Sequence, residues 1–462
     1  MAEELRLYDT MERTVGPVSR SDKKFGIYCC GPTVYNYAHI GNFRTFLAVD
    51  LLVRALELAG YDPLFVRNLT DIDDKTIAGS QAAGESLGAF TARWTNIFRS
   101  DCKKLGLRKP DVEPRATDHI KEQLELIGKL MAQGMAYGRN GSVYFRIGAW
   151  PAYGRLSRLS ERELRAGDGE ESEKENTGDF VLWKATKESD GSVSYASPWG
   201  PGRPGWHIEC SAMALRYLGT NFAIHCGGVD LCFPHHENEI AQTEAATGET
   251  MAQRWFHVAH LSVGGEKMSK SLGNLYTLND IERMPFSPAD LRYALLSGHY
   301  RQPLSFTVDS LRSAAVALGR IREYVRALLG RAGKMPPMAE KFEILAAFWE
   351  ALLDDLNAPK ALGEIFLHIK RSKIDAMGPA AAGRELAEWR RLYYAFGLPW
   401  SDPKNEEITP TEEILALAQK RQSARTEKNF VQSDQLRDEL AARGWRVEDG
   451  ADGYRLHPIE RP

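Results

Sequence analysis

The sequence lacks long hydrophobic runs and a strong net charge. Although 43% of its 462 residues are hydrophobic, no apolar stretch approaches the about 20 residues that a membrane-spanning helix needs. The start has no signal-peptide pattern, so we expect a cytoplasmic protein with no membrane partner. Lys and Arg number 59 against 62 Asp and Glu, a net charge of −3, so any RNA partner must be bound by local basic patches.

Cysteine is also scarce, and no CxxC pair occurs among the six cysteines. So few cysteines in a chain of 51.7 kDa make a poor disulfide framework, and metal binding or catalysis is the better interpretation. For individual cysteines, packing as a small hydrophobe competes with ligand roles. We expect packing for Cys102, and we favour it less strongly for Cys29, Cys226 and Cys232.

Two short segments far apart in the sequence predict one chemical task. The first, residues 38–42 (AHIGN), follows an apolar strand-like run at 25–30 and precedes a helix-like stretch near Arg44, which is the pattern of an anion site at a helix N-terminus. The second, residues 267–271 (KMSKS), follows Gly264 and Gly265 and suits a mobile loop that closes over a polyphosphate. The first segment alone could occur by chance. The second alone could be an ordinary solvated loop. Both together indicate activation by ATP.

With these segments the chain resembles the class I aminoacyl-tRNA synthetases. The resemblance implies that His39 and Asn42 belong to the first family motif and Lys267 and Lys270 to the second, and that ATP is used with Mg²⁺. The enzymes bind ATP and an amino acid so that the carboxylate attacks the α-phosphorus while donor groups stabilise the developing charge. Asn42 departs from the usual final His of the motif, although its amide can still donate to a phosphate.

Residues 206–242 crowd cysteine, histidine and carboxylate side chains together, a mixture that suits zinc. Pro234 fits the first turn of a helix, which places His235 and Glu239 four residues apart on one face. We expect His236 and Glu237 to point elsewhere on that helix. Composition does not choose the sulfur ligands, which remain open among Cys210, Cys226 and Cys232, and between Cys29 and Cys30.

Four stretches narrow the resemblance to the cysteinyl-tRNA synthetase family: CGPTVY at 30–35, RNLTDIDDK at 67–75, WGPGRPGWHIECSAM at 199–213 and FPHHENE at 233–239. The resemblance implies that the substrates are L-cysteine, ATP and tRNA(Cys), and that one zinc ion per chain is bound by Cys30, Cys210, His235 and Glu239. Cys29 and Cys226 depart from the usual family pattern.

Zinc would explain how cysteine is told apart from serine. The metal binds thiolate strongly and lowers the pKa of a thiol, whereas a hydroxyl competes poorly. Selection of this kind removes the need for a hydrolytic editing site. We expect the zinc to gain a fifth ligand, or its bond to Glu239 to lengthen, when cysteine binds.

The resemblance also implies roles in the amino-acid and nucleotide pockets. Thr70 follows a strand-like run, at the sheet edge where open α/β folds bind ligands, and is expected to meet the amino acid. Cys30, Trp206 and His225 are expected to line the same pocket, and Asp230 to bind the ATP ribose. Asp71, Asp73 and Asp74 could form a magnesium cluster, but we favour a capping role at the next helix.

The fold class expected is α/β, a Rossmann-type parallel-sheet catalytic domain with a connective insertion, followed by a helical bundle and a small C-terminal α+β anticodon-binding region. Strand-like runs near 25–30 and 64–69 flank a helix at 45–59, and the charged run at 167–178 is read as a mobile surface loop. The expected boundaries are 1–110 for the first catalytic half, 111–204 for the insertion, 205–262 for the second half, 263–308 for the loop and stem-contact region, 309–400 for the bundle and 401–462 for the C-terminal region.

The last sixty or so residues carry the signs of RNA binding. Lys420, Arg421, Arg425 and Lys428 crowd a helix-like segment, and residues 445–454 read as a hairpin that offers Trp445 and Tyr454 for base stacking. An exposed helix could explain the basic residues, and the bundle could serve only to stabilise the core. Nothing in the sequence demands a partner subunit, so we expect a monomer.

Two other functions compete. A ligase on the same catalytic core that joins activated cysteine to an amino sugar would share the ATP and zinc motifs, but it needs no anticodon reader. A non-catalytic zinc- and RNA-binding descendant would be expected to lose the ATP motifs, and both are present.

Overall fold

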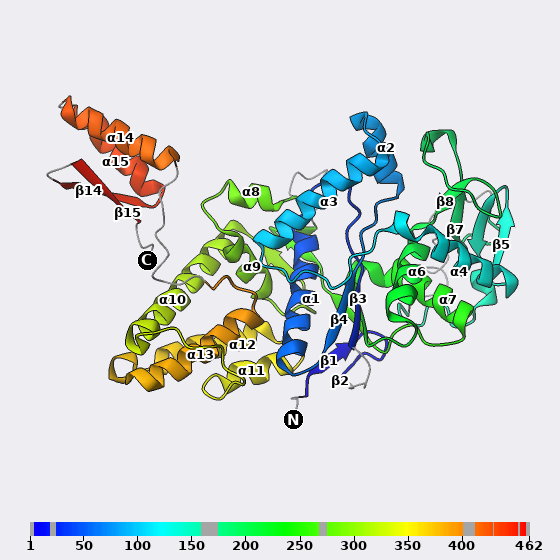
Figure 1. Ribbon diagram of the computed structural model, residues 1–462, viewed down its shortest axis with the longest axis horizontal. Helices are drawn as coiled ribbons and strands as arrows, with labels where there is room; N and C mark the ends of the chain where they lie inside the picture. Colours follow the sequence, from blue (N-terminus) through cyan, green and yellow to red (C-terminus); the bar gives the residue numbers. More distant parts are fainter. Residues whose placement is uncertain are drawn as a thin grey trace.

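The computed structural model describes residues 4–18, 25–158, 174–267, 275–400, 412–427, 429–450 and 453–458. A sheet-based domain lies at the centre of the molecule, with a smaller insertion on one side (Figure 1). A helical bundle and a separate C-terminal unit lie on the other side. Within these ranges no helix is long and apolar enough to cross a bilayer.

The central sheet has four parallel strands in the order β10-β9-β3-β4. Its strands are β3 (Phe25–Cys29), β4 (Pro63–Arg67), β9 (Ile224–Gly228) and β10 (Trp255–Val258). A right-handed crossover is the rule for such parallel pairs, and helix α1 (Ile40–Leu58) makes the connection from β3 to β4. Helix α1 is apolar on nearly all sides and is buried from Phe43 to Leu56, because it packs against the sheet and also against α9 and α13.

The remaining elements of the catalytic domain surround this sheet. They are the hairpin β1 (Arg6–Asp9) and β2 (Thr14–Pro17), and the helices α2 (Asp74–Ala83), α3 (Leu87–Lys104), α6 (Trp206–Leu218) and α7 (Glu237–Thr247). After β10 come β11 (Leu261–Val263), β12 (Glu266–Lys267), α8 (Leu278–Glu282), α9 (Pro288–Leu296) and β13 (Leu304–Phe306). Strand β11 pairs with both β12 and β13, which ties the segment after the sheet into one small second sheet.

The insertion is built on an antiparallel sheet of order β5-β6-β7-β8. Its elements are α4 (Ile120–Ala132), β5 (Ala136–Arg139), β6 (Ser142–Phe145), β7 (Phe180–Ala185) and β8 (Gly202–Pro204). Helix α4 packs on α6 and α7, so the insertion shares a hydrophobic core with the helices that carry candidate metal ligands. Most of the charged run at 167–178 lies outside the described residues.

The second part of the chain is helical. The bundle comprises α10 (Val308–Ala332), α11 (Ala346–Leu353), α12 (Ala358–Arg371) and α13 (Pro379–Ala395). The C-terminal unit pairs α14 (Glu412–Thr426) and α15 (Phe430–Ala442) with the hairpin β14 (Trp445–Gly450) and β15 (Gly453–Pro458). It has a small core of its own, centred on Ile414, Ala418, Leu440 and Trp445.

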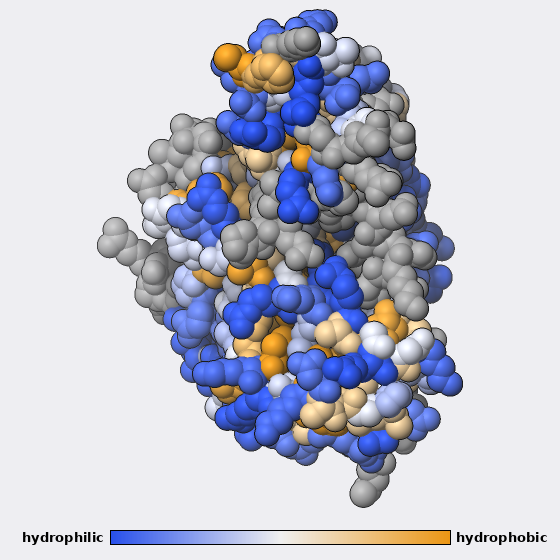
Figure 2. Space-filling view, turned by 90° about the vertical axis from the view of Figure 1, so that its left-hand side faces the viewer, coloured by the Kyte–Doolittle hydropathy of each residue, from blue (hydrophilic) through white to orange (hydrophobic). Residues whose placement is uncertain are grey.

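The face that carries the bundle and the C-terminal unit is largely hydrophilic, with scattered hydrophobic residues (Figure 2). Two of the exposed hydrophobic side chains belong to α15, where Phe430 is 60% and Val431 73% exposed. The α/β architecture with an insertion and a following helical region agrees with the sequence prediction. The N-terminal hairpin was not anticipated, because its strands are only four residues long.

Candidate functional site

The carboxyl ends of β3 and β4 approach each other closely where the site begins. The Gly31 N–H donates to Asn68 Oδ1 over 2.8 Å, and a Cβ at Gly31 would lie 1.6 Å from the Asn68 carbonyl oxygen. Only glycine fits such an approach. Beyond it, Thr70 lies opposite Thr33: its N–H donates to the Pro32 carbonyl and its own carbonyl accepts from the Val34 N–H, each over 3.1 Å. Cys30 and Thr70, both predicted from the sequence to bind substrate, therefore lie at the same edge of the sheet.

The first ATP motif forms the N-terminus of α1. His39 is the N-cap: its Nδ1 accepts from the Asn42 N–H over 3.3 Å, while Asn42 Oδ1 accepts from the His39 N–H over 3.1 Å. This reciprocal capping box leaves the neutral His39 ring with its hydrogen on Nε2. It also leaves the Asn42 amide nitrogen as a donor at the positive end of a helix.

Of the second motif, the structure describes Lys267 alone. Lys267 ends β12, opposite Ser262 in β11, and the chain is described again from residue 275. There the Ile40 N–H donates to the Tyr276 carbonyl over 2.9 Å, and His39 pairs with Thr277. The chain that follows the second motif, at Tyr276 and Thr277, thus lies beside the first motif. Lys270 lies outside the described residues.

A buried cluster of cysteine, histidine and glutamate side chains lies beside this edge. One candidate metal set is Cys30, Cys210, His235 and Glu239, whose ligand atoms lie within 4.8 Å of one another. The Cys30 and Cys210 sulfurs are 4.0 Å apart, and His235 Nε2 lies 3.1 Å from Glu239 Oε1. This is the set that the family resemblance implied. Its N, S and O donors are those of tetrahedral zinc sites.

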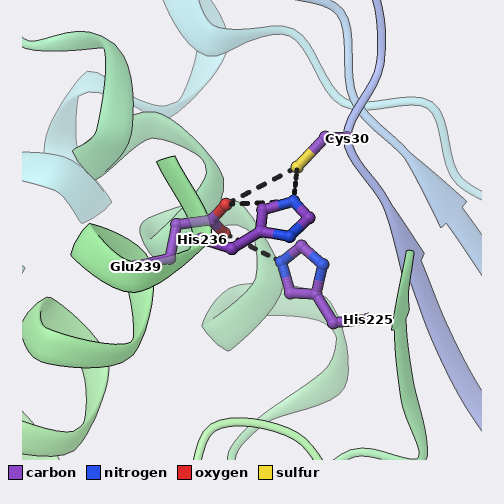
Figure 3. Close-up of side chains that lie close together, drawn as sticks. All are labelled: Cys30, His225, His236 and Glu239. Carbon is purple, nitrogen blue, oxygen red and sulfur yellow. Dashed lines mark hydrogen bonds and ion pairs between the residues drawn. The ribbon is translucent and has the colours of Figure 1, made fainter. Parts of the chain in front are cut away.

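A second set of four shares two of these residues. Cys30, His225, His236 and Glu239 point toward one another (Figure 3). His236 Nε2 lies 3.3 Å from the Cys30 sulfur, and His225 Nε2 lies 2.9 Å from Glu239 Oε2. The expectation that His236 points away was wrong. Pro234 lies in an irregular turn before α7, but His236 has helical backbone angles and precedes Glu239 by three residues, a spacing that also brings two side chains together on a helix.

Glu237 does point away from the cluster, as expected. Its carboxylate accepts the Gly154 N–H over 2.9 Å and the Ser157 N–H over 2.8 Å, and so fixes a turn at the edge of the insertion.

Further histidines support the cluster from behind. His207 Nδ1 lies 2.8 Å from His235 Nδ1. His257 Nε2 lies 2.8 Å from His236 Nδ1, and its other ring nitrogen, Nδ1, lies 2.8 Å from the Thr10 hydroxyl. Groups that bind the second ring nitrogen of a ligand histidine fix its orientation and tautomer. Trp206, half-buried, stacks on His235 with ring centres 4.3 Å apart. His207 and His257 were missed, because no spacing connects them to the ligands.

The four candidate ligands differ in the direction of their pKa shifts. Hydrogen bonding from Cys30 lowers the pKa of Cys210 to about 6. Although burial alone would raise it, His225 and His235 lower the pKa of Glu239 to about 2. Burial also opposes protonation of His235, yet Glu239 and Cys210 raise its pKa to about 10. Burial raises the pKa of the Cys30 thiol. A bound cation would thus displace protons from Cys30 and His235.

The other predicted pocket residues differ in their burial and their partners. His225 is fully buried in β9, while Asp230 is exposed in the short turn that follows β9. Of the three aspartates after β4, Asp73 caps α2 by accepting the Lys75 N–H over 2.7 Å. Asp71 instead binds the Thr117 hydroxyl over 2.6 Å, and Asp74 forms ion pairs with Lys184 and Arg203. Capping therefore holds for Asp73 alone.

Glu209 was missed by sequence reasoning. It lies in the first turns of α6, between Trp206 and Cys210, and is 0% exposed. Burial raises the pKa of Glu209, as do the charges of Cys210, Asp71 and Asp73, while the Thr70 hydroxyl lowers it. Its position next to a ligand cysteine was visible in the sequence, but its burial was not.

The remaining cysteines are packed as expected. Cys29 and Cys226 are opposite each other on β3 and β9, and with Cys102 they belong to the main hydrophobic core. Cys232 is partly buried, and all six cysteines are unpaired thiols.

In the C-terminal unit, two of the predicted RNA-contacting side chains face inward. Arg421 is 3% and Trp445 8% exposed, and Tyr454 packs on the same small core. Lys420 and Arg425 are exposed on α14, and Lys428 lies outside the described residues. The exposed aromatic ring of this unit is Phe430, which the sequence analysis did not single out.

Comparison with known proteins identifies relatives along nearly the whole chain. Residues 17–316 match the family model of the catalytic domain of tRNA synthetases class I (C). A cysteine–tRNA ligase of Opitutus terrae is 47% identical, covering 99% of this chain and 100% of that protein. One of Chlamydia caviae is 41% identical, covering 99% and 98%. One of Brachyspira hyodysenteriae is 42% identical, covering 93% and 94%.

Solved structures show the same fold at low sequence identity. A methionyl-tRNA synthetase of Mycobacterium tuberculosis, in complex with methionyl-adenylate, superposes with a TM-score of 0.57 at 17% identity, covering 81% of this chain and 89% of that one. A LeuRS of Agrobacterium radiobacter, in a ternary complex with tRNA, superposes with a TM-score of 0.58 at 12% identity, covering 86% and 88%.

Proposed function

Because the chain belongs to the class I tRNA synthetases, in the cysteine–tRNA ligase family, we propose that it activates L-cysteine with ATP and transfers the cysteinyl group to the 3′ end of tRNA(Cys). The observation that carries the proposal is that an anion-binding helix N-terminus at His39 and a buried Cys/His/Glu cluster lie at one edge of the parallel sheet. The first suits a polyphosphate and the second suits a thiol held by a metal.

For activation, we assign ATP to the N-terminus of α1. The Nε2–H of His39 and the amide of Asn42 would donate to phosphate oxygens, and we assign Lys267 and Lys270 to the same phosphates. Asp230 would accept from the ribose hydroxyls. The cysteine carboxylate then attacks the α-phosphorus in line and pyrophosphate leaves. These groups stabilise the charge that develops on the phosphorus and on the leaving group. ATP would be bound as its Mg²⁺ complex.

For selection of cysteine, we assign zinc to Cys30, Cys210, His235 and Glu239. The donor set fits, because its four ligand atoms converge and their neighbours lower the pKa values of Cys210 and Glu239, which favours the deprotonated forms that bind a metal. A bound zinc ion supplies a Lewis acid that prefers thiolate to hydroxyl. Thr70, Trp206 and His225 would enclose the amino acid around it.

For the acceptor, we assign the insertion and the C-terminal half of the chain to tRNA, with the C-terminal unit at the anticodon. The relatives named cysteine–tRNA ligase cover both halves of the chain, which favours tRNA over an amino sugar as acceptor. Lys420, Arg425 and Phe430 are exposed on this unit and could meet phosphates and bases. We further propose that the protein is a cytoplasmic monomer with the domain boundaries expected from the sequence.

Cysteine-dependent ATP–pyrophosphate exchange tests the proposal. Exchange is expected with cysteine and, at equal concentration, not with serine. Charging is then expected with tRNA(Cys) and not with an amino sugar. Absence of exchange with cysteine would overturn the proposed activity, and product formation with the amino sugar alone would overturn the proposed acceptor.

A further inference from the structure

Glu209 is a buried carboxylate without a partner. It is 0% exposed, and neither of its oxygens has a hydrogen-bond partner among the described residues. No ion pair of the described chain includes it either. Burying such a group without compensation is costly, and buried polar atoms in native structures nearly always have partners. An unpaired buried carboxylate therefore needs an explanation.

The neighbouring carboxylates all have hydrogen-bond or ion-pair partners. Asp71 accepts from the Thr117 N–H and hydroxyl over 2.9 and 2.6 Å. Asp73 caps α2, and Asp74 binds Lys184 over 2.8 Å. Within this acidic group Glu209 is the member left without a donor, and the charges of Asp71 and Asp73 act on it. A cation brought to this place would be attracted by the whole group.

The place is next to the pocket assigned to the amino acid. Glu209 shares one turn of α6 with Trp206 and Cys210, and the Thr70 hydroxyl lies beside its carboxylate. Thr70 Oγ1 accepts from Asn68 Nδ2 over 3.3 Å. This hydroxyl makes no hydrogen bond to Glu209 in the structure, but on turning to donate to that carboxylate it would keep one lone pair for a further donor. Thr70 is thus a neighbour of Glu209 and belongs to the pocket assigned above.

We propose that Glu209 is the buried counter-charge for the α-ammonium group of the substrate, acting through the Thr70 hydroxyl as a positioning residue. The inference rests on the proposed function, in which the thiol is held by the metal cluster and the carboxylate faces ATP. An ammonium that donates to Thr70 supplies the third point of attachment. Three points fix the orientation of the amino acid, so the carboxylate oxygen is aimed at the α-phosphorus.

A des-amino analogue isolates this interaction. 3-Mercaptopropionate keeps the thiol and the carboxylate of cysteine and lacks only the ammonium. In wild-type protein it is expected to inhibit exchange with a constant at least about 10-fold above the KM for cysteine, since hydrogen bonds to charged groups are strong. In Glu209→Gln the KM for cysteine is expected to rise about 10- to 100-fold, with a much smaller change in kcat, while inhibition by the analogue stays within about 2-fold.

Asp74→Asn is the matched control. It removes a negative charge from the same acidic group at a side chain that is 62% exposed, and it is expected to leave both constants unchanged. If Glu209→Gln raised the KM for cysteine and the inhibition constant of 3-mercaptopropionate by similar factors, the pocket would have lost its structure in general. That result would overturn the proposal. If Glu209→Gln does not fold, the wild-type comparison decides, because equal affinity for cysteine and its analogue excludes a recognised ammonium. Absence of wild-type exchange would instead refute the proposed function itself.

Discussion

At the scale of single residues, Asn42 shows how a departure from a family motif fits its site. Its side-chain oxygen accepts from the His39 N–H and completes the cap of α1, while its amide group remains as a donor. A carboxylate could replace the first contact but not the second.

We therefore expect Asn42→Asp to keep the thermal stability of the protein, since an aspartate oxygen in the first turn can also accept from the His39 N–H and suits the positive end of the helix. Exchange should nevertheless fall about 10- to 100-fold, because a negative charge would face the phosphates of ATP in place of a donor. Asn42→Ala should lose both the contact with the His39 N–H and the amide donor, together with about 1 kcal/mol of stability. Thermal unfolding together with the KM for ATP separates the two effects. An Asn42→Asp variant with full exchange would exclude Asn42 from phosphate binding.

Glu239 carries another residue-scale prediction. Its two oxygens engage His235 at 3.1 Å and His225 at 2.9 Å, so the carboxylate can leave a metal and still be held. X-ray absorption spectroscopy of the zinc-loaded protein should show one added sulfur neighbour when cysteine binds, with a lengthened or lost oxygen neighbour. Serine should produce no such change. A spectrum without added sulfur would mean that the substrate thiol does not join the metal.

At the scale of elements, a buried charge network joins α1, α9 and the end of α13. Asp50 accepts from Arg54 Nε over 2.8 Å, from the Arg108 N–H over 2.6 Å and from Arg292. Arg54 and Arg292 also donate to backbone carbonyls near the ends of α3 and α13. The catalytic domain and the bundle are thereby fixed to each other by groups that cannot be left unpaired.

Asp50→Ala should destabilise the protein by about 3–5 kcal/mol, because it leaves two buried guanidinium groups without a counter-charge. Although burial would raise it, Arg292 and Arg54 hold the pKa of Asp50 below its usual value. A lowered folded-state pKa contributes stability above the unfolded-state value near 4, and this contribution is lost as the pH falls through the folded-state pKa. Urea unfolding between about pH 3 and 7 should show this acid loss in the wild type and not in the variant. Equal pH dependence in both proteins would contradict the assignment.

Elements were predictable where local pattern decides them. The apolar runs of β3 and β4 and the periodicity of α4 and α10 fix their type. The turn before α7 was not predictable in this way, because its path is set by packing against β9 and β10. The same limit applies to His207, His236, His257 and Glu209, whose neighbours come from distant segments. Family likeness supplied four ligands that do converge, but only the structure could add the groups around them.

At the scale of the whole molecule, the C-terminal unit has its own small core and the catalytic domain shares none of it. Removing residues 401–462 should therefore leave cysteine-dependent exchange within about 2-fold of the full chain. Charging of tRNA(Cys) should fall far more, since the proposed anticodon contacts are lost. Exchange and charging measured on the same preparations provide the comparison. Full charging by the shortened chain would remove this unit from tRNA recognition.

The metal cluster joins Cys30 to Cys210 and Glu239, which follow it by 180 and 209 positions. During synthesis on the ribosome, the first ligand leaves the exit tunnel long before the last has been translated, and contacts so distant in sequence form late. The cluster cannot close until the insertion, which lies between Cys30 and Cys210 in the sequence, has been made. A nascent chain that stalls before residue 239 therefore has no complete cluster, and metal capture reports that both halves of the sheet have met.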